Sequence, residues 1–296
     1  MSRPQAITTV SGWLQRGAEH LRRQGVDECE ANAEFIMAHV LELKRPGVLA
    51  QGTRTLDEKQ KHQFWHLILE RAKRLPLAYV LGEQPFLGLD FLVTPSVLVP
   101  RPETEGLVEA VLEELGGTKG PQHILEVGTG SGCISVALAV RLPEAFLYAT
   151  DISRAALELA ERNARRHGVE RRVRLLREDL FRPEARPTPW ADALVSNPPY
   201  IPSGDLRGLS AEVLREPFLA LDGGKDGLDA VRAIAASAIR LLKPGGLLAL
   251  EIGSDQAEAV RGILARQAAA GCPFEEPRIR KDLQGLDRVV LARRCC

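Results

Sequence analysis

The chain has 296 residues, of which 45% are hydrophobic and 26% charged, and its 39 basic and 39 acidic side chains give a formal net charge of zero. This length predicts about two domains. The balanced charge argues against a protein that binds nucleic acid directly, because such proteins usually carry an excess of Lys and Arg.

The five cysteines form no C-x-x-C pair and no Cys/His cluster with metal-ligand spacing, so neither a disulfide scaffold nor a metal site is expected. No stretch reaches the ~18 consecutive apolar residues that a membrane span needs. The first residues also lack the apolar core of a secretory signal. We therefore expect a cytoplasmic monomer whose partner is a protein or a small molecule, with no membrane association.

Residues 1–75 predict a small helical domain. Runs with the helical spacing of apolar residues occur at 9–25, 27–43 and 55–75. We expect Asp27 to cap the second helix, and Thr55 with Glu58 to form a capping box at the start of the third. Residues 76–104 then read as a linker with a hairpin, because the short apolar runs of "FLGLDFLVTPSVLVP" are broken by glycine and proline.

Strands and helices alternate from residue 105 to 296. Strands are expected at 123–127, 146–151, 172–179, 191–196 and 246–252, and helices at 105–116, after Gly132, and at 153–168, 227–242 and 254–269. A terminal hairpin is expected at 278–294. This order predicts an α/β fold, with a doubly wound sheet of the Rossmann-like type and helices on both faces.

The stretch "LEVGTGSGCIS" follows the first of these strands and opens a helix, where a doubly wound sheet binds its cofactor. Cys133 stands where the third glycine of a dinucleotide fingerprint belongs, and no G-K-[ST] follows, which excludes a P-loop. An acidic residue followed by three alternating glycines is instead typical of S-adenosylmethionine-dependent methyltransferases. The candidate cofactor residues here are Glu126, Gly128, Thr129, Gly130, Ser131 and Gly132. The alternative is a turn that merely joins strand to helix.

Acidic residues also end the next two strands. Asp151 follows the glycine turn by about twenty residues, a spacing from which a carboxylate accepts ribose hydroxyls. Asp179 is placed to accept an adenine amino group, with Leu180 packing on the ring, although an ordinary turn would also explain this pair. "LKPGG" at 242–246 is expected to be a turn before the last parallel strand.

The stretch "SNPPY" ends the fourth strand, because proline lacks the N–H that a central strand needs. An amide nitrogen is a poor nucleophile because its lone pair is delocalised. The Asn197 side-chain oxygen and the Pro198 carbonyl could accept its two hydrogens and orient it toward a methyl donor. Tyr200 could stack on a planar acceptor, while Pro198 and Pro199 keep the loop rigid.

Several stretches together resemble the HemK/PrmC family of N5-glutamine methyltransferases that act on class I peptide chain release factors. They are "NPPY", "VLVPRPETEGLVE", "AYVLGEQPFLGLDF", "REPFLALDGGKDGL", "GLDRVV" and the helical N-terminal region. The resemblance extends over essentially the whole chain.

The resemblance implies that residues 128–132, Asp151, Asp179 and Leu180 bind S-adenosylmethionine. It implies that Asn197, Pro198, Pro199 and Tyr200 hold the glutamine of the factor's Gly-Gly-Gln loop, with Asn197 also near the cofactor. The helical domain would dock the factor. Arg101, Glu103 and Glu105 of "PRPETE" would line the mouth of the site or pack the two domains together.

Two other functions share the same chemistry. One is a glutamine methyltransferase that acts on a ribosomal protein, which would also carry NPPY. The other is an adenine N6-methyltransferase of nucleic acid, against which the zero net charge and the lack of an Arg- and aromatic-rich recognition segment argue.

Overall fold

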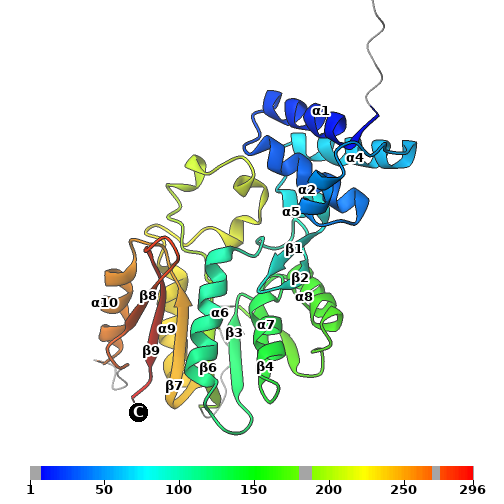
Figure 1. Ribbon diagram of the computed structural model, residues 1–296. Helices are drawn as coiled ribbons and strands as arrows, with labels where there is room; N and C mark the ends of the chain where they lie inside the picture. Colours follow the sequence, from blue (N-terminus) through cyan, green and yellow to red (C-terminus); the bar gives the residue numbers. More distant parts are fainter. Residues whose placement is uncertain (1–7, 180–188, 269–273, 296) are drawn as a thin grey trace, which may run out of the picture. The chain divides into compact units, whose positions relative to one another are not determined.

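The computed structural model describes residues 8–179, 189–268 and 274–295, which form two compact units (Figure 1). The helical unit runs to Gly82 and also contains Ser210–Arg215. The sheet unit contains Glu83–Leu209 and the chain from Glu216 onward. The helical unit is therefore discontinuous in sequence, because six residues from the second half of the chain belong to it.

Within the described residues, the helical unit holds three long helices, as expected, and two short ones that the sequence pattern does not reveal. They are α1 (Val10–Arg23), α2 (Cys29–Leu41), α3 (Arg45–Ala50), α4 (Glu58–Ala72) and α5 (Leu77–Leu81). Phe64 and Ile68 of α4 are fully buried, and the Phe64 ring meets the Trp13 ring of α1 edge-on, with 6.2 Å between ring centroids. The amphipathic faces of these helices thus build a core of their own.

Two expected helix caps are wrong. The α2 helix begins after Glu28, which has a positive φ of 47° and makes no capping hydrogen bond with its side chain, so Asp27 is not the cap. The α4 helix has a capping box two residues later than expected, formed by Asp57 and Gln60. Asp57 prevails over Thr55 because aspartate is the stronger N-cap residue.

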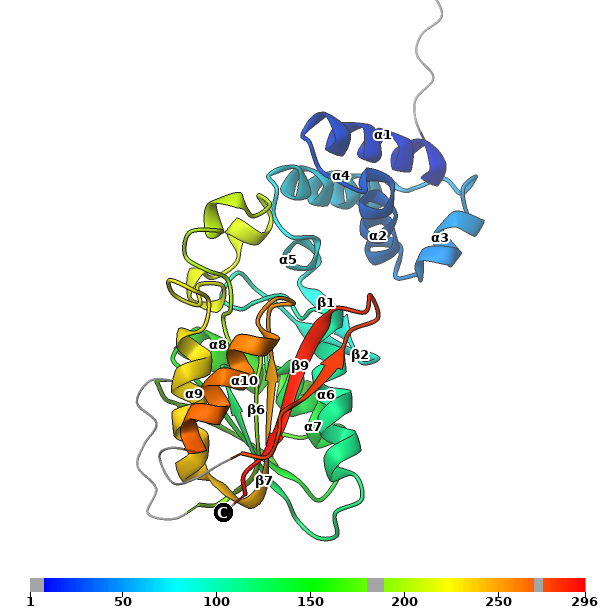
Figure 2. The same ribbon diagram turned by 90° about the vertical axis from the view of Figure 1, so that its left-hand side faces the viewer.

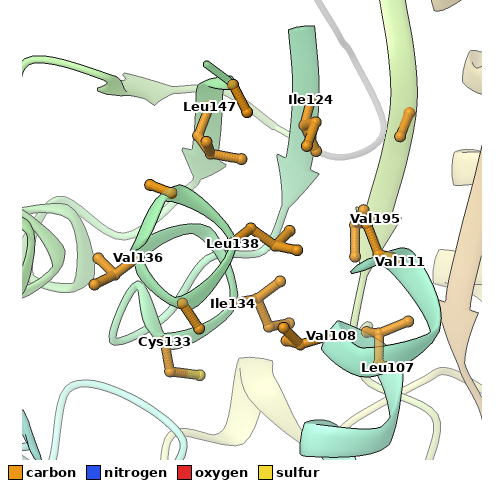
Figure 3. Close-up of a cluster of buried hydrophobic side chains, with 14 of the residues drawn as sticks. Leu107, Val108, Val111, Ile124, Cys133, Ile134, Val136, Leu138, Leu147 and Val195 are labelled. Carbon is orange, nitrogen blue, oxygen red and sulfur yellow. The ribbon is translucent and has the colours of Figure 1, made fainter. Parts of the chain in front are cut away.

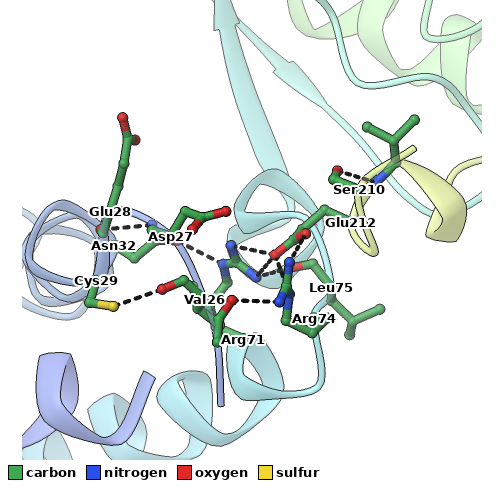
Figure 4. A network of polar contacts seen from close by, with 12 residues as sticks. Val26, Asp27, Glu28, Cys29, Asn32, Arg71, Arg74, Leu75, Ser210 and Glu212 are labelled. Atoms are coloured by element: carbon green, nitrogen blue, oxygen red, sulfur yellow. Dashed lines mark hydrogen bonds and ion pairs between the residues drawn. The ribbon is translucent and has the colours of Figure 1, made fainter. Parts of the chain in front are cut away.

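The six-residue segment is held in the helical unit by an ionic network around Glu212 (Figure 4). Arg74 donates to both oxygens of Glu212 at 2.7 Å, and Arg71 donates to one of them at 3.0 Å. The buried Arg71 also donates to the Asn32 side chain at 2.7 Å. Burial alone would raise the pKa of Glu212, but the hydrogen bonds from Arg74 and Arg71 lower it to about 2.

The sheet unit opens with the expected hairpin, whose strands are β1 (Glu83–Phe86) and β2 (Leu89–Leu92). The main sheet has seven strands in the order β5-β4-β3-β6-β7-β9-β8. These are β3 (His123–Val127), β4 (Phe146–Asp151), β5 (Val173–Arg177), β6 (Ala191–Ser196), β7 (Leu242–Glu251), β8 (Arg278–Lys281) and β9 (Asp287–Arg293). The first five are parallel, and the terminal hairpin adds β9 and β8 antiparallel. The expected doubly wound sheet is confirmed.

Helices cover both faces of this sheet (Figure 2). They are α6 (Pro102–Leu115), α7 (Cys133–Arg141), α8 (Arg154–Arg166), α9 (Asp229–Leu241) and α10 (Ala257–Ala268). On β6, Val195 packs with α6 and α7 on one face, whereas Leu194 packs with α9 and α10 on the other. Figure 3 shows the first cluster, in which Ile134 and Leu138 of α7 lie between the sheet and α6. The apolar strands are buried on both faces, as parallel strands require.

The stretch 242–246 is not a turn before β7, as expected, but the first part of that strand. This part of the strand is irregular. Its pairing with β6 shifts register between Ala191 and Ala193, and Gly245 has a positive φ of 76°. Among the helices of the described ranges, none combines the length and the apolar character needed to cross a bilayer.

Candidate active site

A cavity of about 300 Å³ lies at the carboxyl ends of β3, β4 and β6 in the sheet unit. The strand order reverses between β3 and β6, which is the position where doubly wound sheets bind ligands. The volume is at the lower end of the range for small-molecule sites. Of the residues proposed from sequence, those that line it are Arg101, Gly128, Thr129, Gly130, Ser131, Asp151, Asn197 and Pro199.

The glycine turn forms one wall of this cavity. Gly128 and Gly130 have positive φ values of 75° and 53°, and a Cβ at either position would meet nothing within 4 Å. The backbone N–H groups of Gly128 and Thr129 both donate to the Thr150 carbonyl at 2.9 Å. The turn is therefore fixed from behind and leaves room for a ligand to approach its backbone.

Gly132 has a different role from the other two glycines. It precedes α7 with a φ of 81°, and a Cβ there would lie 3.0 Å from the Cβ of Ala160 and 3.2 Å from its Cα. Gly132 does not line the cavity. It is a glycine because the turn passes directly against α8.

The Asp151 carboxylate is held in a fixed orientation at the cavity wall. Its Oδ2 accepts from the Gly130 N–H and its Oδ1 from the Ser153 N–H, both at 2.9 Å. A carboxylate can accept about four hydrogen bonds. Asp151 therefore keeps acceptor capacity for the hydroxyls of a ligand.

Glu126 lies fully buried and does not line the cavity. Its Oε2 accepts from the Thr129 hydroxyl at 2.7 Å, the Ser135 N–H at 3.1 Å and the Ser135 hydroxyl, whereas Oε1 has no partner among the described residues. Burial raises the pKa of Glu126 to about 7, although the hydrogen bonds from Ser135 and Thr129 act against this shift. The side chain ties the glycine turn to the first turn of α7.

Asp179 lies apart from this cavity, beside a small void of about 20 Å³ that Leu125 and Val127 also line. Leu180, the expected partner of Asp179, lies outside the described residues. The described residues therefore do not bring Asp179 to the wall that Asp151 lines.

The NPPY stretch begins where β6 ends, at Ser196, whose hydroxyl donates to the Val127 carbonyl at 2.7 Å. Asn197 and Pro199 line the cavity, whereas Pro198 and Tyr200 do not. Tyr200 is largely buried, which raises the pKa of its hydroxyl above the ordinary value. The structure thus brings Asn197 to the glycine turn but leaves Tyr200 outside the cavity lining.

The PRPETE stretch supplies three residues to the cavity, Pro100, Arg101 and Thr104. Arg101 pairs with Glu216, whose other oxygen accepts from the Val99 N–H at 3.0 Å. Thr104 was not singled out from sequence, yet its hydroxyl accepts from the Asn197 side-chain amide at 3.0 Å. Glu103 and Glu105 instead line a separate surface groove with Arg280.

Sequence reasoning also missed two segments of the cavity wall, Ser96–Val99 and Pro217–Ala220. In the second segment, Phe218 and Leu219 are 61% and 70% exposed, which is unusual for side chains of this size. Phe218 and Leu219 of "REPFLAL" were a signal for this wall, because they lie in a short 3-10 helix and are not buried in the core.

The cavity thus joins a ligand-accessible backbone turn, a fixed carboxylate and a side-chain amide at one edge of the sheet. This combination suits the binding of a nucleoside-containing cofactor next to a polar acceptor. In the ranges that the structure describes, no group of three or more His, Cys, Asp or Glu side chains could hold a metal ion.

Comparison with known proteins assigns both units. Residues 12–82 match the family model of the PrmC N-terminal domain, and residues 104–257 match that of the methyltransferase small domain. A release factor glutamine methyltransferase of Moorella thermoacetica is 47% identical over 97% of this chain and 99% of its own length. One of Geobacter sulfurreducens is 42% identical over 98% of each chain. The crystal structure of a methyltransferase from Pyrococcus furiosus shares the fold, with a TM-score of 0.50 and 23% identity over 71% of this chain and 90% of that one.

Proposed function

Since the chain belongs to the family of release factor glutamine methyltransferases, we propose that it transfers a methyl group from S-adenosylmethionine to a release factor. The methyl acceptor is the side-chain amide nitrogen, N5, of the glutamine in the Gly-Gly-Gln loop of class I peptide chain release factors. The observation that carries this proposal is the position of the Asn197 amide, which lines the same cavity as the glycine turn and Asp151.

The residues around the glycine turn fit S-adenosylmethionine. The backbone at Gly128 and Gly130 is open to the cavity because no Cβ stands in the way, and Asp151 offers free acceptor sites. We assign Gly128 to Ser131 to contact with the cofactor and Asp151 to its ribose hydroxyls. Asp179, which lies beside the separate small void, and Leu180 keep only the assignment to the adenine that the sequence suggests. Glu126 and Gly132 act indirectly, since they shape the turn. When bound, the cofactor supplies an electrophilic methyl group.

Asn197 and the neighbouring backbone act on the acceptor glutamine. The side-chain oxygen of Asn197 and the carbonyl of Pro198 accept the two N–H hydrogens of the glutamine amide, which localises the nitrogen lone pair and orients it. Pro199 forms part of the cavity wall. Tyr200 lies outside the cavity lining and supports the loop that holds the planar amide of the acceptor. Methylation makes this nitrogen cationic and its hydrogens acidic, so one proton is released to water after the transfer and no base has to remove it first.

The helical unit, which matches the family's N-terminal domain model, is assigned to docking of the release factor. We place the reaction in the cytoplasm, where translation ends, and we propose a monomeric enzyme that takes no nucleic acid as substrate. Equal numbers of acidic and basic residues favour a protein substrate over a polyanion.

The test is transfer of labelled methyl from S-adenosylmethionine to a purified class I release factor. Label is expected on the factor and absent from its variant in which the loop glutamine is replaced by alanine. Parallel reactions with ribosomal proteins and with DNA examine the two other acceptors that suit this chemistry. Label on either of these, with none on the release factor, would overturn the proposal.

A further inference from the structure

The side-chain amide of Asn197 has one protein partner, the hydroxyl of Thr104, among the residues that the structure describes. Asn197 follows the end of β6, and Thr104 lies in the first turn of α6, 93 residues earlier. Thr104 is only 2% exposed, and both residues line the cavity. The contact therefore joins the proposed acceptor site to an element outside the NPPY stretch.

The Thr104 hydroxyl also lies beside the carboxyl group of Glu251, whose pKa burial raises to about 7 and the contact with Thr104 lowers. Glu251 ends β7, the strand beside β6, and is 1% exposed. Its Oε2 has no partner among the described residues. An ionised carboxylate can only accept, so while Glu251 is ionised the hydrogen shared between the two groups comes from Thr104.

These two contacts together determine which way the Asn197 amide faces. A threonine hydroxyl has a single hydrogen, and beside an ionised Glu251 that hydrogen is best directed at the carboxylate. Toward Asn197 the hydroxyl oxygen can then only accept, so the NH₂ group of Asn197 must face it. The oxygen Oδ1 is left to face away from Thr104, and none of the described residues donates to it.

This orientation matters for an acceptor that carries an NH₂ group. If the Asn197 amide were turned over, its own NH₂ would face the NH₂ of a glutamine, and two donors would oppose each other. When its oxygen faces the acceptor, the Asn197 amide can accept a hydrogen bond from a glutamine NH₂ group, whereas it repels a glutamate carboxylate. The orientation thus bears on binding, on alignment for transfer and on the choice between amide and acid.

We propose that Thr104 and Glu251 are positioning residues that hold the Asn197 side-chain amide with its oxygen toward the acceptor nitrogen. This inference rests on the proposed function, because it concerns the acceptor of that reaction. Neither residue needs to touch the transferred methyl group.

The test compares Thr104→Val with Thr104→Ser in an otherwise unchanged enzyme. Valine keeps the volume but removes the hydroxyl, whereas serine retains it. Two release factors are used, one with the native loop glutamine and one with Gln→Glu at that position. The measurements are the kcat for label transfer, the Kd for S-adenosylmethionine and the Kd for each factor.

Thr104→Val is expected to lower kcat on the order of tenfold without changing the cofactor Kd, because misorientation affects only the acceptor. The Kd for the glutamate factor divided by the Kd for the glutamine factor measures the preference for glutamine. In this variant the ratio should fall toward one, since the Asn197 amide can then turn over. Thr104→Ser should retain the wild-type kcat and preference. A general loss of structure would instead weaken the binding of both factors equally and leave the ratio unchanged.

Glu251 provides an independent second arm. Glu251→Leu frees the Thr104 hydrogen to donate to Asn197, so the glutamine preference should again collapse, whereas Glu251→Gln keeps an acceptor and should preserve it. An unchanged preference in both Thr104→Val and Glu251→Leu would overturn the inference. So would an equal defect in Thr104→Ser. Failure of the proposed function is distinct, since the wild-type enzyme itself would then leave the factor unlabelled.

Discussion

The side-chain nitrogen of Gln256 donates to the backbone carbonyl of Tyr200 at 3.0 Å. The same nitrogen donates to the Gly227 carbonyl at 3.2 Å, and the side-chain oxygen accepts from the Gly253 N–H at 2.9 Å. A Cβ on Gly227 would lie 2.3 Å from the Tyr200 carbonyl, so the two backbones approach as closely as only glycine allows. Gln256 and Gly227, which come well after the NPPY stretch in the sequence, therefore hold its last residue, Tyr200, in place.

We expect Gln256→Leu to lower kcat on the order of tenfold, because the acceptor loop loses its support and a small misplacement at a reacting centre is costly. The Kd for S-adenosylmethionine should stay unchanged, since Gln256 does not line the cavity. Asp255→Asn, at the exposed neighbouring position, is the control and should behave as wild type. A cofactor Kd that rises as much as kcat falls would show that Gln256 supports the whole site rather than the acceptor loop.

The parallel strands and the glycine turn could be predicted from sequence because both depend on local patterns. A buried strand shows as an apolar run, and a backbone with positive φ favours glycine, as at Gly128, Gly130 and Gly132. The N-terminal caps were misplaced by one or two residues, because candidate caps such as Thr55 and Asp57 stand close together and the sequence does not decide between them.

The supports of the acceptor site could not be predicted, because they come from tertiary contacts without a local pattern. Thr104 meets Asn197 across 93 residues, and Gln256 meets Tyr200 across 56. Likewise, nothing in the sequence indicates that Glu212 joins the helical unit through Arg71 and Arg74. A motif predicts the residues that touch a ligand more readily than those that hold them in place.

Two alanine substitutions in the glycine turn should separate cofactor binding from folding. Gly132→Ala places a methyl group against Ala160 in a left-handed conformation, so it should lower the free energy of unfolding by at least the ~1–2 kcal/mol of that conformation. Gly128→Ala carries the same conformational cost, but its methyl group points into open space. Urea unfolding and cofactor titration measure the two effects.

For the same loss of stability, Gly128→Ala is expected to weaken S-adenosylmethionine binding more than Gly132→Ala does. The reason is that the new methyl group at position 128 occupies space at the cavity wall. If the two variants lost stability equally and bound the cofactor equally, the distinction between a ligand-facing and a packing glycine would be wrong.

Because of Glu126, the free energy of unfolding should fall as pH rises from about 4.3 to about 7. The pKa of Glu126 is raised to about 7 by burial. A glutamate in the unfolded chain titrates near pH 4.3, so between about 4.3 and about 7 the folded protein retains a proton that the unfolded chain has lost. The stability that this group contributes is complete below the unfolded pKa and is lost as pH rises through the folded one.

Glu126→Gln removes that dependence while filling the same space. The unfolding free energy of wild type minus that of the variant should decrease with pH in this window, with a slope approaching ~1.4 kcal/mol per pH unit. Urea unfolding at a series of pH values measures it. A difference that stays flat from pH 4 to pH 8 would mean that Glu126 has the same pKa in the folded protein as in the unfolded chain.

Glu212 should show the opposite pH dependence. Its pKa is lowered to about 2 by the hydrogen bonds from Arg74 and Arg71, which outweigh burial. Its contribution to stability is therefore present above the unfolded pKa of about 4.3 and is lost as pH falls toward the folded value. Glu212→Gln leaves the buried Arg71 without its charge partner, and we expect a loss of about 3 kcal/mol at pH 7.

The control is Glu58→Gln, the same substitution in the pair with Lys61, where the glutamate side chain is 91% exposed. Such exposed pairs contribute little, so this variant should unfold like wild type. Thermal unfolding of both variants at pH 7 and pH 3 gives the comparison. An equal effect of the two substitutions at pH 7 would show that the Glu212 network does not stabilise the helical unit.

Substitution of Asn197 should affect the rate of methyl transfer, whereas substitution of Asp151 should affect cofactor binding. Asn197→Ala removes the proposed acceptor of the glutamine N–H, so kcat should fall on the order of 100-fold, the loss seen when one oriented polar group is removed from a transition state. The cofactor Kd should change little. Asp151→Asn should do the reverse, because it weakens an acceptor for the ribose while leaving the acceptor loop intact.

The decisive measurement is single-turnover label transfer at saturating S-adenosylmethionine, together with calorimetric titration of the cofactor. At saturation the Asp151 variant should recover most of the wild-type rate, whereas no cofactor concentration should restore the Asn197 variant. Equal losses of rate and cofactor affinity in Asn197→Ala would place that side chain at the cofactor. The distance of 3.0 Å between Asn197 and Thr104 would then reflect support of the cofactor wall rather than orientation of an acceptor amide.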